Sequence, residues 1–167
     1  MKESIDPKIY FDTALYHARL AFDQGEVPVG ALVLLNDIVI GVGRNQKESR
    51  FNPCSHAEIE AIQKAGRTLK TWRLTECTLI TTLEPCPMCM GALQQARIKK
   101  VIYGAKDEKG GALSLGYHLH DDQRLNYQFE VEYSPQEECS QILTEFFKKK
   151  RSEKKDKNSI EASEFLR

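Results

Sequence analysis

Two short motifs place three metal-binding side chains and one carboxylate close together in the sequence. The first motif is His56-Ala57-Glu58, and the second is Pro85-Cys86-Pro87-Met88-Cys89, whose two cysteines stand three positions apart. Imidazole and thiolate are ligands that zinc prefers, and three protein ligands leave the fourth tetrahedral position open, as in catalytic zinc sites. The motifs therefore predict one zinc ion per chain, bound by His56, Cys86 and Cys89.

Glu58 gives this predicted metal site a group that can move protons. It follows His56 by two positions, so its carboxylate can reach toward the open position of the metal. Zinc lowers the pKa of bound water to about 7 in favourable sites, and a neighbouring carboxylate can take that proton and return it to a substrate. We therefore predict that Glu58 is the catalytic acid and base.

Cys54 offers an alternative in which a fourth protein ligand closes the site and makes it structural. Cys54 lies only two positions from His56, so the two side chains could bind one metal only with awkward geometry. This alternative also gives Glu58 no role, and we favour the open site. We interpret the remaining histidines and cysteines as surface or packing side chains: His17, His118, His120, Cys77 and Cys139.

Hydrophobic periodicity places both motifs at the starts of predicted helices. Apolar residues recur at helical spacing from Tyr10 to Phe22, and Asn36-Asp37 separates two apolar runs suited to an antiparallel hairpin. Strands and helices then alternate, which favours a three-layer α/β/α sandwich on a mixed five-stranded sheet. The expected segments are strands at 27–35, 38–42, 78–83, 100–103 and 128–133, and helices at 10–22, 57–65, 88–96 and from Pro135.

The composition is that of one globular domain. The 167 residues include 41% hydrophobic and 29% charged residues, and 24 basic residues balance 24 acidic ones. No apolar run is long enough to span a bilayer, the first seven residues resemble no secretory segment, and five cysteines suit a reducing compartment, so we expect a cytoplasmic protein. We assign residues 1–151 to the catalytic domain and 152–167 to a disordered charged tail.

The two motifs together resemble the signature of the cytidine deaminase-like zinc enzymes, His-x-Glu followed by Pro-Cys-x-x-Cys. Within that family, the chain is most similar to the bacterial deaminases that act on adenosine in tRNA. The likeness runs from about Glu26 to Lys150. It includes these residues: Glu26–Ala31, Asn45, His56–Glu58, Thr82–Cys86, Met88, Cys89, Gly91, Ala92, Arg97, Ile98, Gly104, Ala105, Asp107, Lys109, Phe146 and Phe147.

The resemblance implies a reaction, a substrate and an assembly. The reaction is hydrolytic deamination of adenosine to inosine at the first (wobble) anticodon position of tRNA, with zinc activating water and Glu58 shuttling protons. The family binds the anticodon stem-loop as a homodimer whose active sites use residues of both chains. By the same resemblance, Asn45 and the backbone around Val27 and Ala57 hold the base.

Three other interpretations stay open at this level. A deaminase of free guanine or cytosine shares the metal motif, a non-catalytic RNA-binding protein could keep zinc for stability, and an accessory subunit would need another chain. Without the resemblance, Asn45 would be a turn residue. The basic residues after Phe147 either bind RNA phosphates or form a solvated helix end. Residues 115–120 follow no pattern that predicts a structure.

Overall fold

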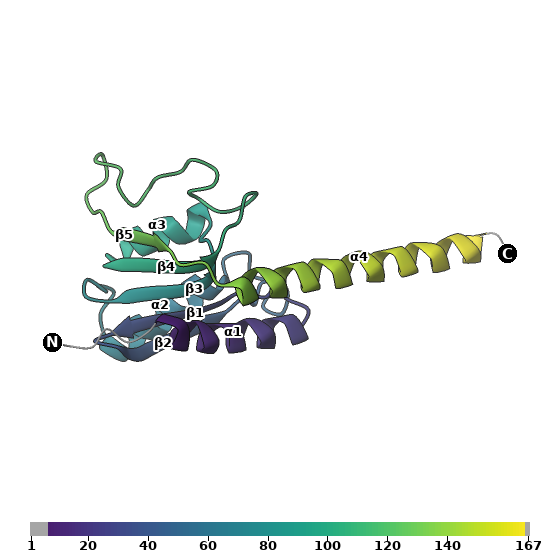
Figure 1. Ribbon diagram of the computed structural model, residues 1–167, viewed down its shortest axis with the longest axis horizontal. Helices are drawn as coiled ribbons and strands as arrows, with labels where there is room; N and C mark the ends of the chain where they lie inside the picture. The colour runs from purple at the N-terminus through teal and green to yellow at the C-terminus, as the bar shows by residue number, and fades with distance from the viewer. Residues whose placement is uncertain (1–6, 166–167) are drawn as a thin grey trace.

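The computed structural model describes the backbone of residues 7–165 and the side chains of residues 7–157. The predicted absence of a secretory segment concerns residues that lie mostly outside this range. The helices and strands, drawn in Figure 1, are α1 (Pro7–Asp23), β1 (Gly30–Leu35), β2 (Ile38–Arg44), α2 (Ala57–Leu69), β3 (Thr78–Leu83), α3 (Pro87–Gln95), β4 (Lys100–Ala105), β5 (Glu130–Tyr133) and α4 (Glu137–Phe165).

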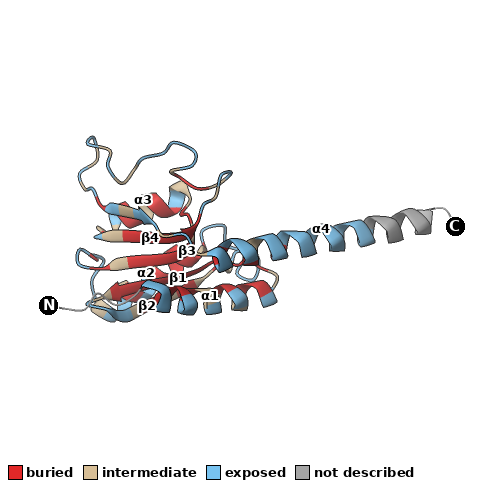
Figure 2. Cartoon of the chain, viewed as in Figure 1, coloured by how far each residue is buried: buried red, intermediate tan, exposed pale blue. Residues whose placement is uncertain are grey.

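The predicted three-layer α/β/α sandwich and mixed five-stranded sheet are confirmed. The strand order is β2-β1-β3-β4-β5, in which β1 pairs antiparallel with β2 and β3, while β3, β4 and β5 run parallel. Helices α2 and α3 pack on one face of the sheet, and α1 with the first part of α4 packs on the other. The central strands are buried on both faces (Figure 2).

Alternation along the strands divides the core between the two faces. Ala31, Val33, Leu79 and Val101 join the cluster beneath α2 and α3, whereas their strand neighbours Leu32, Leu34, Ile80 and Ile102 join the cluster beneath α1 and α4. Successive residues of a strand point to opposite faces, so a sheet covered on both sides needs continuous apolar strands. This explains the apolar residues at successive positions of all three strands, although β3 also contains Thr78, Thr81 and Thr82.

The turn between β1 and β2 matches the prediction from Asn36-Asp37. Asn36 and Asp37 have positive φ values of 49° and 66°, as a type I′ hairpin turn requires. The Tyr10 hydroxyl of α1 donates a hydrogen bond to the carbonyl oxygen of Asp37 at 2.9 Å, which anchors the turn to the helix layer.

The first strand is shorter than predicted. It begins at Gly30 rather than at Val27, because Pro28 has no N–H to donate and the Val29 N–H bonds locally to the Val27 carbonyl oxygen. Residues 27–29 therefore lie outside β1, although the carbonyl oxygen of Val29 accepts a hydrogen bond from the Asn45 N–H. The sequence predicts a mixed sheet but assigns β1 no partner beyond the hairpin, and the structure pairs β1 antiparallel with β3 as well.

The last helix is longer than predicted. The prediction of a disordered tail from Ser152 is wrong for the backbone, because α4 continues to Phe165 and projects away from the rest of the molecule (Figure 1). Residues 148–165 contain no proline or glycine, and Lys150 pairs with Glu153 one turn later at 3.5 Å. Both features favour a helix over an irregular chain. The division of the chain at residue 151 stays a prediction.

No helix within residues 7–165 combines the length and apolar character needed to cross a membrane.

Helix α2 packs directly against β2 because Gly43 has no side chain. A Cβ atom at Gly43 would collide with the backbone of Ala57 and Ala61 in α2. We expect Gly43→Ala to push the start of α2 away from the sheet and to lower the free energy of unfolding by about 1–3 kcal/mol. Urea denaturation measures this difference.

Gly91 in α3 is the matched control, because a Cβ there meets no atom within 4 Å. Gly91→Ala should raise the free energy of unfolding by roughly 0.5–1 kcal/mol through helix propensity alone. Equal stability of Gly43→Ala and the wild type would contradict the close packing of α2 on β2.

Candidate active site

The two motifs occupy the N-termini of α2 and α3. His56 is the N-cap residue of α2 in an extended conformation, and Cys86 is the N-cap residue of α3, with Pro87 fixing the first helical position. Neither side chain caps its own helix by a hydrogen bond. The unpaired N–H groups and the positive end of the helix dipole therefore favour thiolate at Cys86 and Cys89.

The two helix starts bring His56, Cys86 and Cys89 to one point. The Nδ1 atom of His56 lies 3.6 Å from Sγ of Cys86 and 3.5 Å from Sγ of Cys89. Tetrahedral zinc with Zn–N and Zn–S bonds of about 2.0 and about 2.3 Å sets nitrogen and sulfur about 3.5 Å apart. The three residues predicted from the sequence therefore fit zinc in both donor type and spacing.

Cys54 does not join this group. Its side chain is exposed. The ligand atoms of His56, Cys86 and Cys89 all lie within 4.8 Å of one another, and Cys54 is not part of this group. The geometry therefore supports an open metal position rather than a site closed by a fourth thiolate.

The pKa values of the two cysteines are shifted in opposite directions. Hydrogen bonds from Cys89 and His56, which outweigh the effect of burial, lower the pKa of Cys86 to about 4. The hydrogen bond to Cys86, together with burial, raises the pKa of Cys89 well above its usual value. One thiolate is thus favoured before any metal binds, and zinc needs to displace only the second thiol proton.

Glu58 lies in the first turn of α2, beside the metal-binding group. Its side chain is 4% exposed, and its Oε2 lies 3.6 Å from Sγ of Cys89, within hydrogen-bonding distance. Burial raises the pKa of Glu58 to about 7, although its own backbone N–H and the charge of His56 act in the opposite direction. A carboxyl group with this pKa is suited to both accepting and donating a proton near neutral pH.

A cavity of about 260 Å³ opens onto the metal-binding group. This volume is below the roughly 300–1,000 Å³ of pockets for drug-sized ligands, and suits one ring system. All the predicted site residues line it except the buried Cys89. The lining residues are Val27, Val29, Asn45, Lys47, His56, Ala57, Glu58, Leu83, Glu84, Cys86, Asp107 and Phe147.

Asn45 contributes an unpaired polar atom to this cavity. Its backbone N–H donates to the carbonyl oxygen of Val29 at 3.1 Å, which fixes the residue at the end of β2. Its Oδ1 atom is buried and has no hydrogen-bond partner among the described residues. Buried polar atoms are almost always hydrogen-bonded, so this oxygen indicates a donor on a bound ligand.

Several cavity residues were not predicted as functional from the sequence. Lys47, Glu84, Asp107 and Phe147 come from four separate segments that meet only in the fold. The available signals were weak. Glu84 stands two positions before Cys86 and directly follows a strand that has no charged residue.

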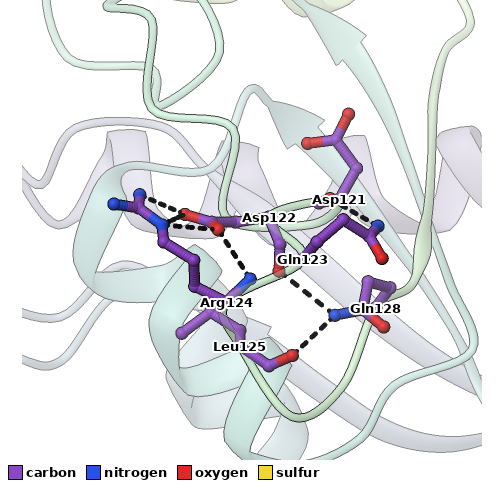
Figure 3. A network of polar contacts seen from close by, with 6 residues as sticks. All are labelled: Asp121, Asp122, Gln123, Arg124, Leu125 and Gln128. Carbon is purple, nitrogen blue, oxygen red and sulfur yellow. Dashed lines mark hydrogen bonds and ion pairs between the residues drawn. The ribbon is translucent and has the colours of Figure 1, made fainter.

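The other histidines lie outside this site. His118 and His120 form a separate group with Asp121 on the long loop between β4 and β5, and the side chains of His118 and Asp121 are exposed. The adjoining residues are held by local contacts among Asp122, Arg124 and Gln128 (Figure 3). We assign this group no role.

Comparison with known proteins places the chain among deaminases. Residues 5–151 match the profile of the MafB19-like deaminase family. The chain belongs to this family. Over 149 residues it is 40% identical to the tRNA-specific adenosine deaminase of Bacillus subtilis strain 168, covering 89% of this chain and 92% of that protein.

Two solved structures extend the comparison. A structure from a study of A-to-I editing by tRNA:A34 deaminases at the wobble position of transfer RNA matches this deaminase with a TM-score of 0.78 and 35% identity, covering 81% of this chain and 99% of the other. The guanine deaminase of Bacillus subtilis matches with a TM-score of 0.60 and 33% identity, covering 68% and 71% of the two chains. Both confirm the fold class.

The proposed ligand set makes a prediction about zinc content. We expect the purified wild-type deaminase to hold about one zinc ion per chain. The variants His56→Ala, Cys86→Ala and Cys89→Ala should each lose most of this zinc, because the two protein ligands that remain bind it too weakly. Cys54→Ala is the matched control and should keep the metal. Mass-spectrometric metal analysis distinguishes these outcomes, and loss of zinc from Cys54→Ala would indicate a closed, structural site.

Proposed function

We propose that this deaminase hydrolyses adenosine to inosine at the first anticodon position of tRNA, with one zinc ion per chain. The observation that supports the chemistry most strongly is the buried Glu58 carboxyl beside His56, Cys86 and Cys89, at the base of a cavity sized for one ring system. The substrate is supported by the relative named tRNA-specific adenosine deaminase, which matches most of the chain.

Each group in the cavity has a distinct part in the reaction. Zinc held by His56, Cys86 and Cys89 would make a water molecule nucleophilic near neutral pH. Glu58 accepts a proton from that water, delivers it to N1 of adenine, and passes the second proton to the departing amino group. The C6–N bond breaks as the C6 carbonyl forms, and ammonia leaves. This scheme is the general one for zinc nucleobase deaminases.

Residues of the cavity wall bind the base in this proposal. The unpaired Oδ1 of Asn45 accepts a hydrogen bond from the substrate, and the backbone around Val27 and Ala57 forms the rest of the pocket. Val27 is available for this because residues 27–29 make no sheet hydrogen bonds of the β1–β3 ladder. The local turn at Pro28 thus keeps Val27 out of β1 and beside the cavity.

The surroundings of the cavity suit RNA. Phe147 lines the opening with 45% of its surface exposed, which leaves its ring accessible to a stacking base. The exposed residues Lys148–Arg151 follow it along α4 and are positioned to neutralise phosphates. A base enters such a cavity only when it leaves its stack, and this costs least in a loop. An anticodon loop meets that requirement.

The remaining features of the proposal rest on the family. We propose that the enzyme acts in the cytoplasm as a homodimer, with both chains contributing to each active site. We also propose that residues 1–151 form the deaminase domain and that the rest of α4 is an appendage, since the family match ends at residue 151.

Product analysis tests this function directly. An anticodon stem-loop with adenosine at its first anticodon position should yield inosine at that position when incubated with the zinc-loaded enzyme, as measured by mass spectrometry of nucleosides. Glu58→Gln should keep its zinc but lose about 10²–10⁴-fold in turnover, because only proton transfer is removed. Ammonia release from guanine or cytosine without inosine in the RNA would contradict the proposal.

A further inference from the structure

Glu84 is a buried carboxylate that the reaction scheme leaves without a part. It follows β3 and stands two positions before Cys86, its side chain is 2% exposed, and it belongs to the cavity wall. Its backbone N–H donates to the carbonyl oxygen of Ala105 at 2.8 Å, which joins the ends of β3 and β4. Glu84 therefore lies between the metal-binding loop and the segment that leaves β4.

The carboxylate is compensated by hydrogen bonds from one loop. Its Oε2 accepts from the backbone N–H of Asp107 at 3.0 Å and from the hydroxyl of Ser114 at 2.7 Å, and its Oε1 accepts from the backbone N–H of Ser114 at 2.8 Å. Within the described residues, no lysine or arginine pairs with it. A buried charge without a counter-ion depends on such donors, so loop and carboxylate stabilise one another.

The loop is wrapped tightly around this side chain. A Cβ at Gly111 would overlap the Glu84 carboxylate, so the backbone of Gly111 packs directly on it. The N–H of Gly111 donates to the carbonyl oxygen of Asp107 at 2.8 Å, and the N–H of Ala112 donates to that of Pro85 at 2.9 Å. The loop therefore takes its shape from Glu84, and this shape places Asp107 in the cavity wall.

Glu26 has a similar arrangement next to Val27, a residue of the cavity wall. Its side chain is 1% exposed, and its oxygens accept from the N–H groups of Ser49 at 2.7 Å and Glu48 at 3.1 Å. Burial acts to raise the pKa of Glu26, but these hydrogen bonds outweigh it and the pKa is lowered. The loop that Glu26 holds includes Lys47, which lines the cavity.

We infer that Glu84 is a positioning residue for the reaction, whose carboxylate fixes the loop 107–114 as one wall of the base-binding cavity. This inference rests on the proposed function. Glu84 makes no contact with the reacting atoms in this scheme and acts only through the loop. Its loss should therefore weaken the binding of the RNA more than it slows the chemical step.

Glu84→Gln tests the inference with little change in size. An amide can accept through one oxygen only, and its NH₂ group would face the N–H groups that now donate to the carboxylate. We expect the KM for the stem-loop to rise by about tenfold, the scale of one lost charged hydrogen bond, with kcat changed by less than about threefold. Zinc content should not change.

Hydrogen exchange locates the effect. In Glu84→Gln the backbone amides of residues 107–114 should exchange faster, whereas in the matched variant Glu26→Gln the faster exchange should fall on residues 47–49. Ser114→Ala removes only the hydroxyl contact and should shift KM and exchange in the same direction by less. It provides the test if Glu84→Gln does not fold.

Two results would overturn the inference. Unchanged KM and unchanged exchange at 107–114 would show that the loop keeps its shape without the carboxylate. Lost zinc and lower kcat at unchanged KM would show that Glu84 acts on the Cys86 segment instead. Hydrogen exchange needs no turnover, so an enzyme that made no inosine would refute the proposed function while exchange still decided whether Glu84 holds the loop.

Discussion

The site depends on two helices, α2 and α3, that begin next to each other beyond the carboxyl ends of β2 and β3. His56 and the two cysteines are 30 and 33 positions apart in the chain, yet His56 Nδ1 lies within 3.6 Å of both sulfur atoms. The close packing of α2 on Gly43 places one helix start, and the parallel β3–α3–β4 crossover places the other at the end of β3. Both helix dipoles then point into the same small volume, where they favour anions.

Three buried glutamates in or next to this volume differ in the groups that contact their carboxyls. Glu58 has a thiol as its side-chain partner, and burial raises its pKa to about 7. Glu26 accepts backbone N–H groups, which outweigh the effect of burial and lower its pKa. Glu84 accepts three donors from one loop. A carboxyl that must exchange protons thus has few donors, whereas carboxylates that hold loops have several.

Much of this arrangement could be predicted from the sequence, because it is encoded locally. The metal motif, the turn at Asn36-Asp37 and the bounds of β3 depend on nearby residues, and the structure agrees with the sequence at each. Other features depend on contacts made only in the fold. They are the late start of β1, its antiparallel pairing with β3, and the hydrogen bonds of Glu84 to a loop 23 to 30 residues away. Periodicity contains no information about such partners.

The central claim is that zinc has three protein ligands and one open position next to Glu58. X-ray absorption spectroscopy at the zinc edge of the purified protein measures the coordination shell most directly. The expected shell has two sulfur ligands at about 2.3 Å, one imidazole nitrogen and one further light atom at about 2.0 Å. A shell with three sulfur ligands would show that Cys54 closes the site, and would contradict a catalytic metal there.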